Sequence, residues 1–177
     1  MRKKVIAAEV CKLLNALYFA VIIIMLLIKL GVISFCIVIG ESMEPTLRTG
    51  DFLIQMNSKH APEYGDIVTF HCENLDKILV KRVIGLPGDT IELSGNRVSR
   101  NGVPLDEQYA VLGNDEEGET SCAFRVEDGC AFVLGDNRPV SCDSRSDLVG
   151  QIPIEDINCC LRLGRHPFAA RLVEKTA

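Results

Sequence analysis

Ser42 and Lys81 are the two residues whose chemistry could together carry a reaction. Ser42 lies in Gly40–Leu47, on an expected turn between a glycine and a proline that would expose its hydroxyl. A serine hydroxyl is a weak nucleophile at neutral pH and needs an adjacent base. Because Gly-x-Ser also occurs in ordinary turns, this segment alone does not establish catalysis.

The base is expected to be a lysine. None of the three histidines lies in a recognisable triad context: they are His60, His71 and His166. The segment Ile78–Gly85 is apolar apart from Lys81 and Arg82, and strand alternation directs these two side chains to opposite faces. A desolvated lysine loses its charge and can accept a proton, whereas arginine stays protonated. We therefore assign the base to Lys81 and expect Arg82 at the surface or in a salt bridge; an exposed strand edge is the alternative for the pair.

Short strands are expected to position these residues. Beyond residue 40, runs of branched and aromatic side chains alternate with turn residues. The expected strands are Phe52–Met56, Asp66–Phe70, Ile78–Ile84, Thr90–Leu93, Cys122–Val126 and Cys130–Leu134. The turn pairs Gly95-Asn96 and Asn101-Gly102 bracket a small ribbon at Arg97–Ser99. The sequence therefore predicts an all-β body, a folded antiparallel sheet or barrel.

The N-terminus predicts a membrane anchor. Met1–Lys4 is basic, and Leu13–Ile28 is apolar at all but two positions. A bilayer core needs about 20 helical residues. We expect a cytoplasmic N-terminus at 1–12, a single transmembrane helix at 13–32 and an extracytoplasmic domain at 33–177. A cleaved signal and a buried core helix are the alternatives, but the apolar stretch is longer than the usual ~7–15 residues of a signal.

Composition narrows the classes of function. The chain has 177 residues, 47% of them hydrophobic, which suits one domain of ordinary size. A net charge of -5, with no basic run after the N-terminus, argues against nucleic acid as the main partner. The eight cysteines form no Cys-x-x-Cys pair and no histidine falls at metal-ligand spacing near one, so we expect no metal site. We expect no cofactor either, and the pairing of the cysteines stays open. We expect Gly113–Glu119 to be a solvated acidic loop, and Arg162–Ala177 a surface tail or a membrane-surface contact.

Several motifs resemble those of the bacterial type I signal peptidases and occur in that family's order. Gly40–Leu47 resembles the nucleophile motif, and Lys81–Asp89 resembles the motif that carries the general base. Gly135–Arg138, followed by Ser141–Arg145, resembles the last signature. The segments cover most of residues 36–150, and the single anchor and compact size resemble the shorter forms of Gram-positive bacteria.

The resemblance implies roles for five polar residues. Ser42 matches the nucleophile and Lys81 the general base. Ser141 matches the hydroxyl that orients the lysine. Asp143 and Arg145 match a pair that steadies the site, for which an ordinary surface salt bridge is the alternative.

The resemblance also implies how the substrate is held. Val38 and Val80 match positions that line apolar pockets for small substrate residues, and Met43 should pack beside the nucleophile. Some members carry a serine two residues before the nucleophile, where this chain has Gly40. The oxyanion hole would then consist of backbone N–H groups, chiefly that of Ser42, and such preorganised donors contribute ~3–4 kcal/mol.

The implied function is removal of N-terminal signal peptides from exported preproteins by a membrane-bound serine endopeptidase, through an acyl-enzyme. The expected partners are preproteins with small residues before the cut and membrane lipid. A self-cleaving regulator with Ser-Lys chemistry is an alternative, against which the hydrophobic N-terminus argues. A membrane-tethered binding module without catalysis is another, against which intact Ser42, Lys81 and Ser141 argue.

Overall fold

The computed structural model describes residues 2–56, 61–95, 97–113 and 121–161. The chain separates into two units, Met1–Ser34 and Phe35–Ala177. The expected acidic loop and the basic C-terminal stretch fall mostly or wholly outside the described residues. The two units are therefore taken in turn.

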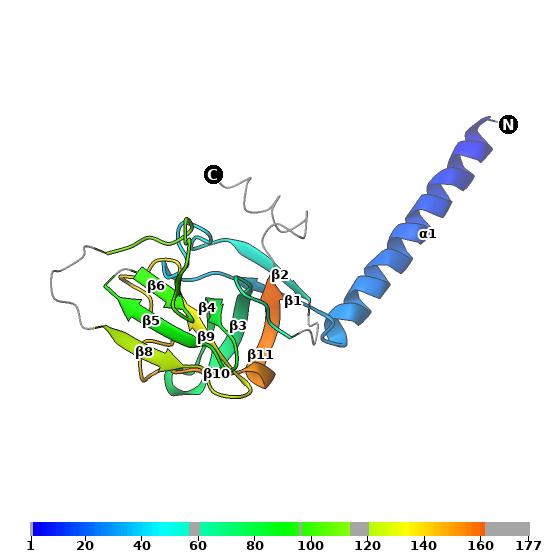
Figure 1. The fold of residues 1–177 in the computed structure, drawn as a ribbon. Coiled ribbons are helices and arrows are strands. Elements are labelled where there is room, and N and C mark those ends of the chain that lie inside the picture. The colour runs from blue at the N-terminus through cyan, green and yellow to red at the C-terminus, as the bar shows by residue number, and fades with distance from the viewer. Residues whose placement is uncertain (1, 57–60, 96, 114–120, 162–177) are drawn as a thin grey trace. The chain divides into compact units, whose positions relative to one another are not determined.

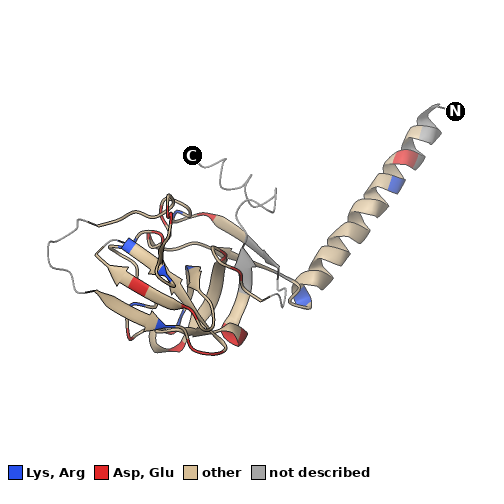
Figure 2. Ribbon diagram, viewed as in Figure 1, with Lys and Arg blue, Asp and Glu red and all other residues tan. Residues whose placement is uncertain are grey.

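The first unit is formed by one helix, α1 (Arg2–Lys29). Its segment Glu9–Lys29 has a mean hydropathy of 2.4 and is long and apolar enough to cross a membrane by length and composition. Between Lys12 and Lys29 the sequence of α1 holds no charged residue, and the ribbon in Figure 2 carries no blue or red there. The helix ends before Val32, the end of the predicted span, because Gly31 takes a φ of 67° and the Val32 N–H bonds back to the Leu27 carbonyl, as in a Schellman C-cap.

After α1, the described residues form three sheets, and the two larger sheets are antiparallel throughout (Figure 1). The five-stranded sheet has the order β10 (Ile152–Pro153), β9 (Cys130–Leu134), β4 (Lys77–Gly85), β3 (Ile67–Cys72) and β11 (Ile157–Leu161). The four-stranded sheet has the order β7 (Val103–Pro104), β6 (Arg97–Arg100), β5 (Thr90–Ser94) and β8 (Cys122–Arg125). β1 (Ile33–Ile37) and β2 (Phe52–Met56) form a two-stranded sheet. Two 3-10 turns, η1 (Glu73–Leu75) and η2 (Ile154–Asp156), complete the described elements.

Three clusters of buried side chains hold this unit together. In β9, Val133 packs into one cluster with Val68 and Phe70, whereas Phe132 and Leu134 pack into a second. β9 is thus buried on both faces, which accounts for its continuous apolar sequence. A third cluster lies beside the segment that carries Ser42: its buried members are Val38, Met43, Leu47, Leu53 and Ile67. Full burial of each large apolar side chain contributes about 1.5–3 kcal/mol.

The predicted all-β body is confirmed. β2 and β9 have the predicted bounds, and the expected β6–β7 turn is present, with positive φ at both Asn101 and Gly102. Four strands were not predicted: they are β1, β7, β10 and β11. β1 is missing from the prediction because its residues continue the apolar run of the N-terminal segment, and β7 and β10 are too short for an alternation pattern.

Candidate active site

β4 places Lys81 inside the β unit, next to Ser42. The lysine is 2% exposed and lies opposite Val68 of β3. Its Nζ hydrogen-bonds to Ser42 Oγ at 2.7 Å and donates to the Val80 carbonyl at 3.0 Å. The fold therefore brings together the predicted nucleophile and the predicted base, which are 39 residues apart in the chain.

Burial controls the charge of this lysine. Desolvation is the largest influence and lowers the pKa of Lys81, while the negative charges of Asp143 and Asp136 and the nearby Cys142 thiol act to raise it. The positive charge of Arg145 lowers it further. The net effect favours the neutral amine, which is the form that can accept a proton.

The Ser42 turn is fixed at both ends by hydrogen bonds. Gly40 has a φ of 108°, and the Thr49 hydroxyl accepts from its N–H at 3.0 Å and donates to its carbonyl at 3.1 Å. On the other side, the Asn137 N–H donates to the Ser42 carbonyl at 3.0 Å and the Asn137 side chain donates to the Glu41 carbonyl. The nucleophile turn is thereby attached directly to the loop that follows β9.

Gly135, the first residue after β9, is the point where this loop meets the nucleophile turn. Its N–H donates to Asp143 at 2.9 Å and its carbonyl accepts from Arg138 Nε at 3.0 Å. A Cβ at this position would overlap the side chain of Ser141 and come within 2.6 Å of the Ser42 carbonyl oxygen. Only glycine fits without displacing one of these two serines.

Ser141 lies in the same crowded region. Among the described residues, its Oγ is the buried side-chain oxygen or nitrogen that has no hydrogen-bond partner. Leaving a buried hydroxyl unpaired costs about 1–3 kcal/mol, so the position calls for an explanation beyond packing. Lys81 Nζ bonds to Ser42 and Val80 here, and an orienting contact from Ser141 to the lysine stays a prediction.

Asp143 and Arg145 form an ion pair of 2.8 Å between Oδ1 and Nε. The carboxylate is fully buried, whereas the arginine side chain is 32% exposed. Arg145 Nη2 also donates to the Arg138 carbonyl at 2.7 Å. The pair is therefore more than a surface contact. Asp143 accepts a hydrogen bond from the Gly135 N–H, and Arg145 binds the Arg138 carbonyl in the loop between Gly135 and Asp143.

Comparison with known proteins identifies the family. A sequence model described as signal peptidase, peptidase S26, matches residues 10–165. The chain is 35% identical over 152 residues to the protein named probable signal peptidase I-1 of Synechocystis sp., covering 80% of this chain and 75% of that one. It is 38% identical over 144 residues to signal peptidase I of Bacillus caldolyticus, covering 72% and 78% respectively. The chain belongs to the signal peptidase family.

A solved structure agrees with this membership. The fold is similar to that of a signal peptidase I from Enterococcus faecalis V583, with a TM-score of 0.51 and 31% sequence identity. The match covers 59% of this chain and 100% of that one. Membership of the signal peptidase family supports a peptidase that removes signal peptides.

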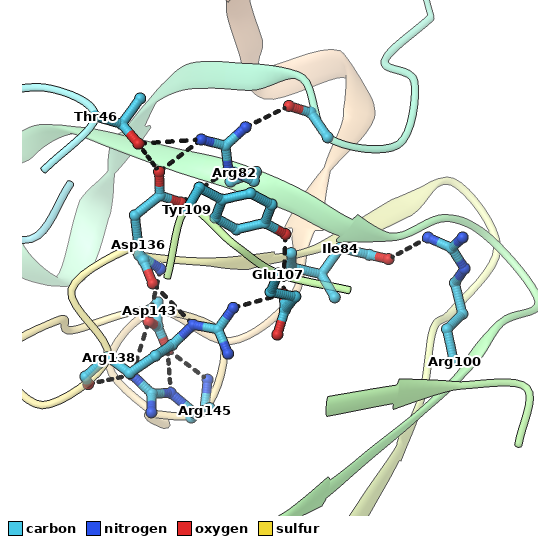
Figure 3. Close-up of polar contacts among 12 residues, drawn as sticks. Thr46, Arg82, Ile84, Arg100, Glu107, Tyr109, Asp136, Arg138, Asp143 and Arg145 are labelled. Carbon is cyan, nitrogen blue, oxygen red and sulfur yellow. Dashed lines mark hydrogen bonds and ion pairs between the residues drawn. The ribbon is translucent and has the colours of Figure 1, made fainter. Parts of the chain in front are cut away.

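The signal peptidase fold also assembles a polar network that the sequence patterns did not reveal. Arg82 lies in a salt bridge, one of its two expected placements, and binds Asp136 through both Nε and Nη2 (Figure 3). Both side chains are buried, and the Thr46 hydroxyl donates to the same carboxylate. Tyr109 lies with its ring centroid 3.9 Å from the Arg82 guanidinium carbon. No local sequence signal identifies these partners, because each comes from a different loop or strand.

The predicted pocket residues of this signal peptidase lie in one cluster. Val38 and Met43 are buried, and Val80 packs against them half-buried. Val80 also precedes Lys81 and accepts a hydrogen bond from its Nζ. Met43 is buried in the cluster next to the nucleophile turn, while pocket formation by Val38, Met43 and Val80 stays a prediction.

In the part of the chain that the structure describes, no histidine contacts Ser42. His71 is exposed at the end of β3 and lies 3.4 Å from Asp76. His60 and His166 lie outside the described residues. This leaves Lys81 as the described basic side chain that contacts Ser42.

Proposed function

We propose that this chain is a membrane-bound serine endopeptidase that removes N-terminal signal peptides from exported preproteins with Ser42 as nucleophile and Lys81 as general base. One observation carries the proposal: Lys81 Nζ lies 2.7 Å from Ser42 Oγ in a buried setting. The same burial lowers the pKa of Lys81 and so favours the neutral amine that a base requires.

The reaction proceeds in two stages. Neutral Lys81 takes the proton of Ser42 as Oγ attacks the scissile carbonyl carbon, and the resulting ammonium donates a proton to the leaving amine. The C–N bond breaks, the mature protein leaves, and the signal peptide stays bound to Ser42 as an ester. Lys81 then takes a proton from water, which attacks the ester and releases the signal peptide. The serine regains its proton at the end of the cycle.

Two further groups support the charges that develop. The backbone N–H of Ser42 donates to the oxyanion, and Gly40, having no side chain, allows the scissile carbonyl to approach this turn. Ser141 accepts a hydrogen bond from the Lys81 ammonium and so orients it. This role would explain why a buried hydroxyl is kept without another partner.

The apolar cluster beside the dyad sets the substrate preference. Val38 and Val80 line pockets for the residues before the cut, and Met43 packs in the same apolar cluster. A large substrate side chain would collide with the branched valines. The enzyme therefore cuts after small residues.

The N-terminal helix sets the location of the enzyme. Its apolar segment Glu9–Lys29 anchors the chain in the membrane, with lipid around it. The basic residues Arg2, Lys3 and Lys4 keep the N-terminus in the cytoplasm, so the β unit acts outside the cytoplasm, where signal peptides emerge.

The test is cleavage of a preprotein in detergent, with the new N-terminus of the product sequenced. Wild type should cut after a small residue, and Ser42→Ala and Lys81→Ala should be inactive. Lys81→Arg should be inactive too, because it keeps the cation but not a titratable amine. Lys77→Ala and Ser94→Ala change exposed residues of β4 and β5 and are the matched controls, which should retain activity. Cleavage that survives loss of both Ser42 and Lys81 would refute the dyad.

A further inference from the structure

A second buried ion pair has no part in the proposed reaction but contacts the loop that packs against Ser42. Arg138 Nη2 lies 2.6 Å from Glu107 Oε1, and the two side chains are 6% and 8% exposed. Glu107 belongs to the segment 105–111 that follows β7, whereas Arg138 follows β9. Two parts of the chain that are distant in sequence are thus joined by buried charges.

Through Arg138, the ion pair is connected to the nucleophile side of the site. Arg138 Nε donates to the Gly135 carbonyl at 3.0 Å while its Nη2 binds Glu107. The Ser141 side chain and the Ser42 carbonyl oxygen occupy the space that a Cβ on Gly135 would need. The Arg138 side chain therefore helps to hold the backbone of Gly135 in place, and Ser141 and the Ser42 carbonyl both pack against Gly135.

Through Tyr109, Glu107 is also connected to the strand of the base. The Tyr109 hydroxyl donates to the same Oε1 at 2.9 Å, and its ring covers the guanidinium of Arg82 (Figure 3). Arg82 follows Lys81 directly in β4 and is bound to Asp136. A single carboxylate oxygen thus has two partners: Arg138, which binds Gly135, and Tyr109, which covers Arg82.

Backbone hydrogen bonds hold the two segments side by side. The Val111 N–H donates to the Asp136 carbonyl at 2.8 Å, and the Arg138 N–H donates to the Val111 carbonyl at 3.0 Å. The Ala110 N–H closes a turn onto the Glu107 carbonyl at 2.9 Å. The Glu107 side chain is therefore presented to Arg138 from a fixed backbone.

We propose that Glu107 is a positioning residue for the Ser42–Lys81 dyad, acting through Arg138 on Gly135 and through Tyr109 on Arg82. The inference rests on the proposed function, since it assigns a support to that dyad. Glu107 touches neither substrate nor reacting atoms. It acts by fixing the distance between the nucleophile turn, which carries Ser42, and β4, which carries Lys81.

Loss of the carboxylate has a specific consequence. Glu107→Ala leaves the Arg138 cation buried without its partner and the Tyr109 hydroxyl without its acceptor. Arg138 then turns towards water and releases the Gly135 carbonyl. A displacement of about 1 Å at a catalytic group can cost about 100-fold in rate. We expect kcat to fall by roughly 10- to 100-fold with KM nearly unchanged, because the substrate pockets are untouched.

The same displacement should change the pKa of Lys81. The groups that act on its charge are Asp143, Cys142, Asp136 and Arg145, and burial is the dominant influence. Admitting water beside the lysine weakens the desolvation that lowers its pKa. We expect the pKa of Lys81 to rise in Glu107→Ala, so that the acid limb of the rate profile moves to higher pH.

The experiment uses the full chain in detergent with lysine labelled at 13Cε. NMR titration gives the pKa of Lys81, whose signal is assigned by its loss in Lys81→Arg, and this readout does not require cleavage. The variants are Glu107→Ala, Glu107→Gln and the control Asp106→Asn, which removes a neighbouring exposed charge. Glutamine keeps an acceptor oxygen but loses the charge, and charge-assisted bonds are about twice as strong, so its effect should be smaller in the same direction.

The outcomes separate this inference from the proposed function. A raised Lys81 pKa and a lower kcat at constant KM in Glu107→Ala, with Asp106→Asn like wild type, support the positioning role. A folded Glu107→Ala with wild-type pKa and kcat overturns it. If Glu107→Ala does not fold, a Glu107→Gln variant identical to wild type in both readouts overturns it. A wild type that cuts no signal peptide, but whose Lys81 pKa responds to Glu107, refutes the proposed function and leaves the positioning role standing.

Discussion

Gly135→Ala is the substitution with the most direct bearing on the geometry of the site. Gly135 does not adopt a left-handed φ, so its backbone accepts alanine, and the effect of the added methyl group is purely steric. The new Cβ would overlap the Ser141 side chain and lie 2.6 Å from the Ser42 carbonyl oxygen. The loop after β9 and the nucleophile turn must therefore move apart.

The size of the effect follows from that distance. Ordinary van der Waals contact begins at 3.4 Å, so separation by roughly 1 Å is needed. Moving Ser42 by this amount from Lys81 should lower kcat/KM by about 100-fold, which corresponds to about 2.7 kcal/mol of transition-state stabilisation. Overpacking should also reduce the free energy of unfolding by about 1–3 kcal/mol.

The assay compares kcat/KM for a signal-peptide substrate with Tm from circular dichroism. Gly85→Ala is the comparison, because its Cβ would also be crowded, at 2.8–3.0 Å, but only by the side chains of Ile91 and Val126. It should lower Tm with a far smaller loss of kcat/KM. Wild-type kcat/KM in Gly135→Ala would refute the steric argument. Equal losses in both variants would show that general destabilisation, not displacement of Ser42, is responsible.

Three further predictions concern charge and specificity. Activity should fall as pH drops through the pKa of Lys81. Because burial lowers that pKa, Lys81 binds its proton more readily in the unfolded chain, so the free energy of unfolding should rise with pH between the folded and unfolded pKa values. Urea unfolding should show this rise in wild type and not in Lys81→Met. Asp136→Asn leaves the buried Arg82 cation without a carboxylate and should cost about 3–5 kcal/mol in urea unfolding, whereas the exposed Asp147→Asn should cost little. Val80→Ala should enlarge the pocket and raise kcat/KM for a substrate with valine before the cut about tenfold relative to one with alanine; an unchanged ratio would remove Val80 from the pocket.

Local sequence patterns were sufficient for the class of fold. Alternating branched residues and turn pairs predicted most strands, and β2 and β9 have the predicted bounds. Such patterns work because side-chain alternation and turn geometry depend on neighbours in the chain. They failed at β11, whose residues show no clear alternation, and at β1, which is indistinguishable by composition from the apolar run of the N-terminal helix.

The candidate nucleophile and the candidate base also came from sequence. Ser42 and Lys81 lie in motifs that resemble those of a known family, and a lysine in an apolar strand has a physical reason to lose its charge. The 2.7 Å contact between them was not available from the motifs, since it depends on how β4 and the nucleophile turn are held together.

The sequence by itself thus determined the long apolar N-terminal helix, the β body and the candidate nucleophile and base, because each leaves a pattern over a few adjacent residues. Only the tertiary structure placed Glu107 against Arg138, 31 residues away, and Tyr109 over Arg82. A glutamate and an arginine in loops have no periodicity that distinguishes them from solvated surface charges. Their burial, and hence their influence on the dyad, follows from the register of strands and the packing of loops that bring distant segments together.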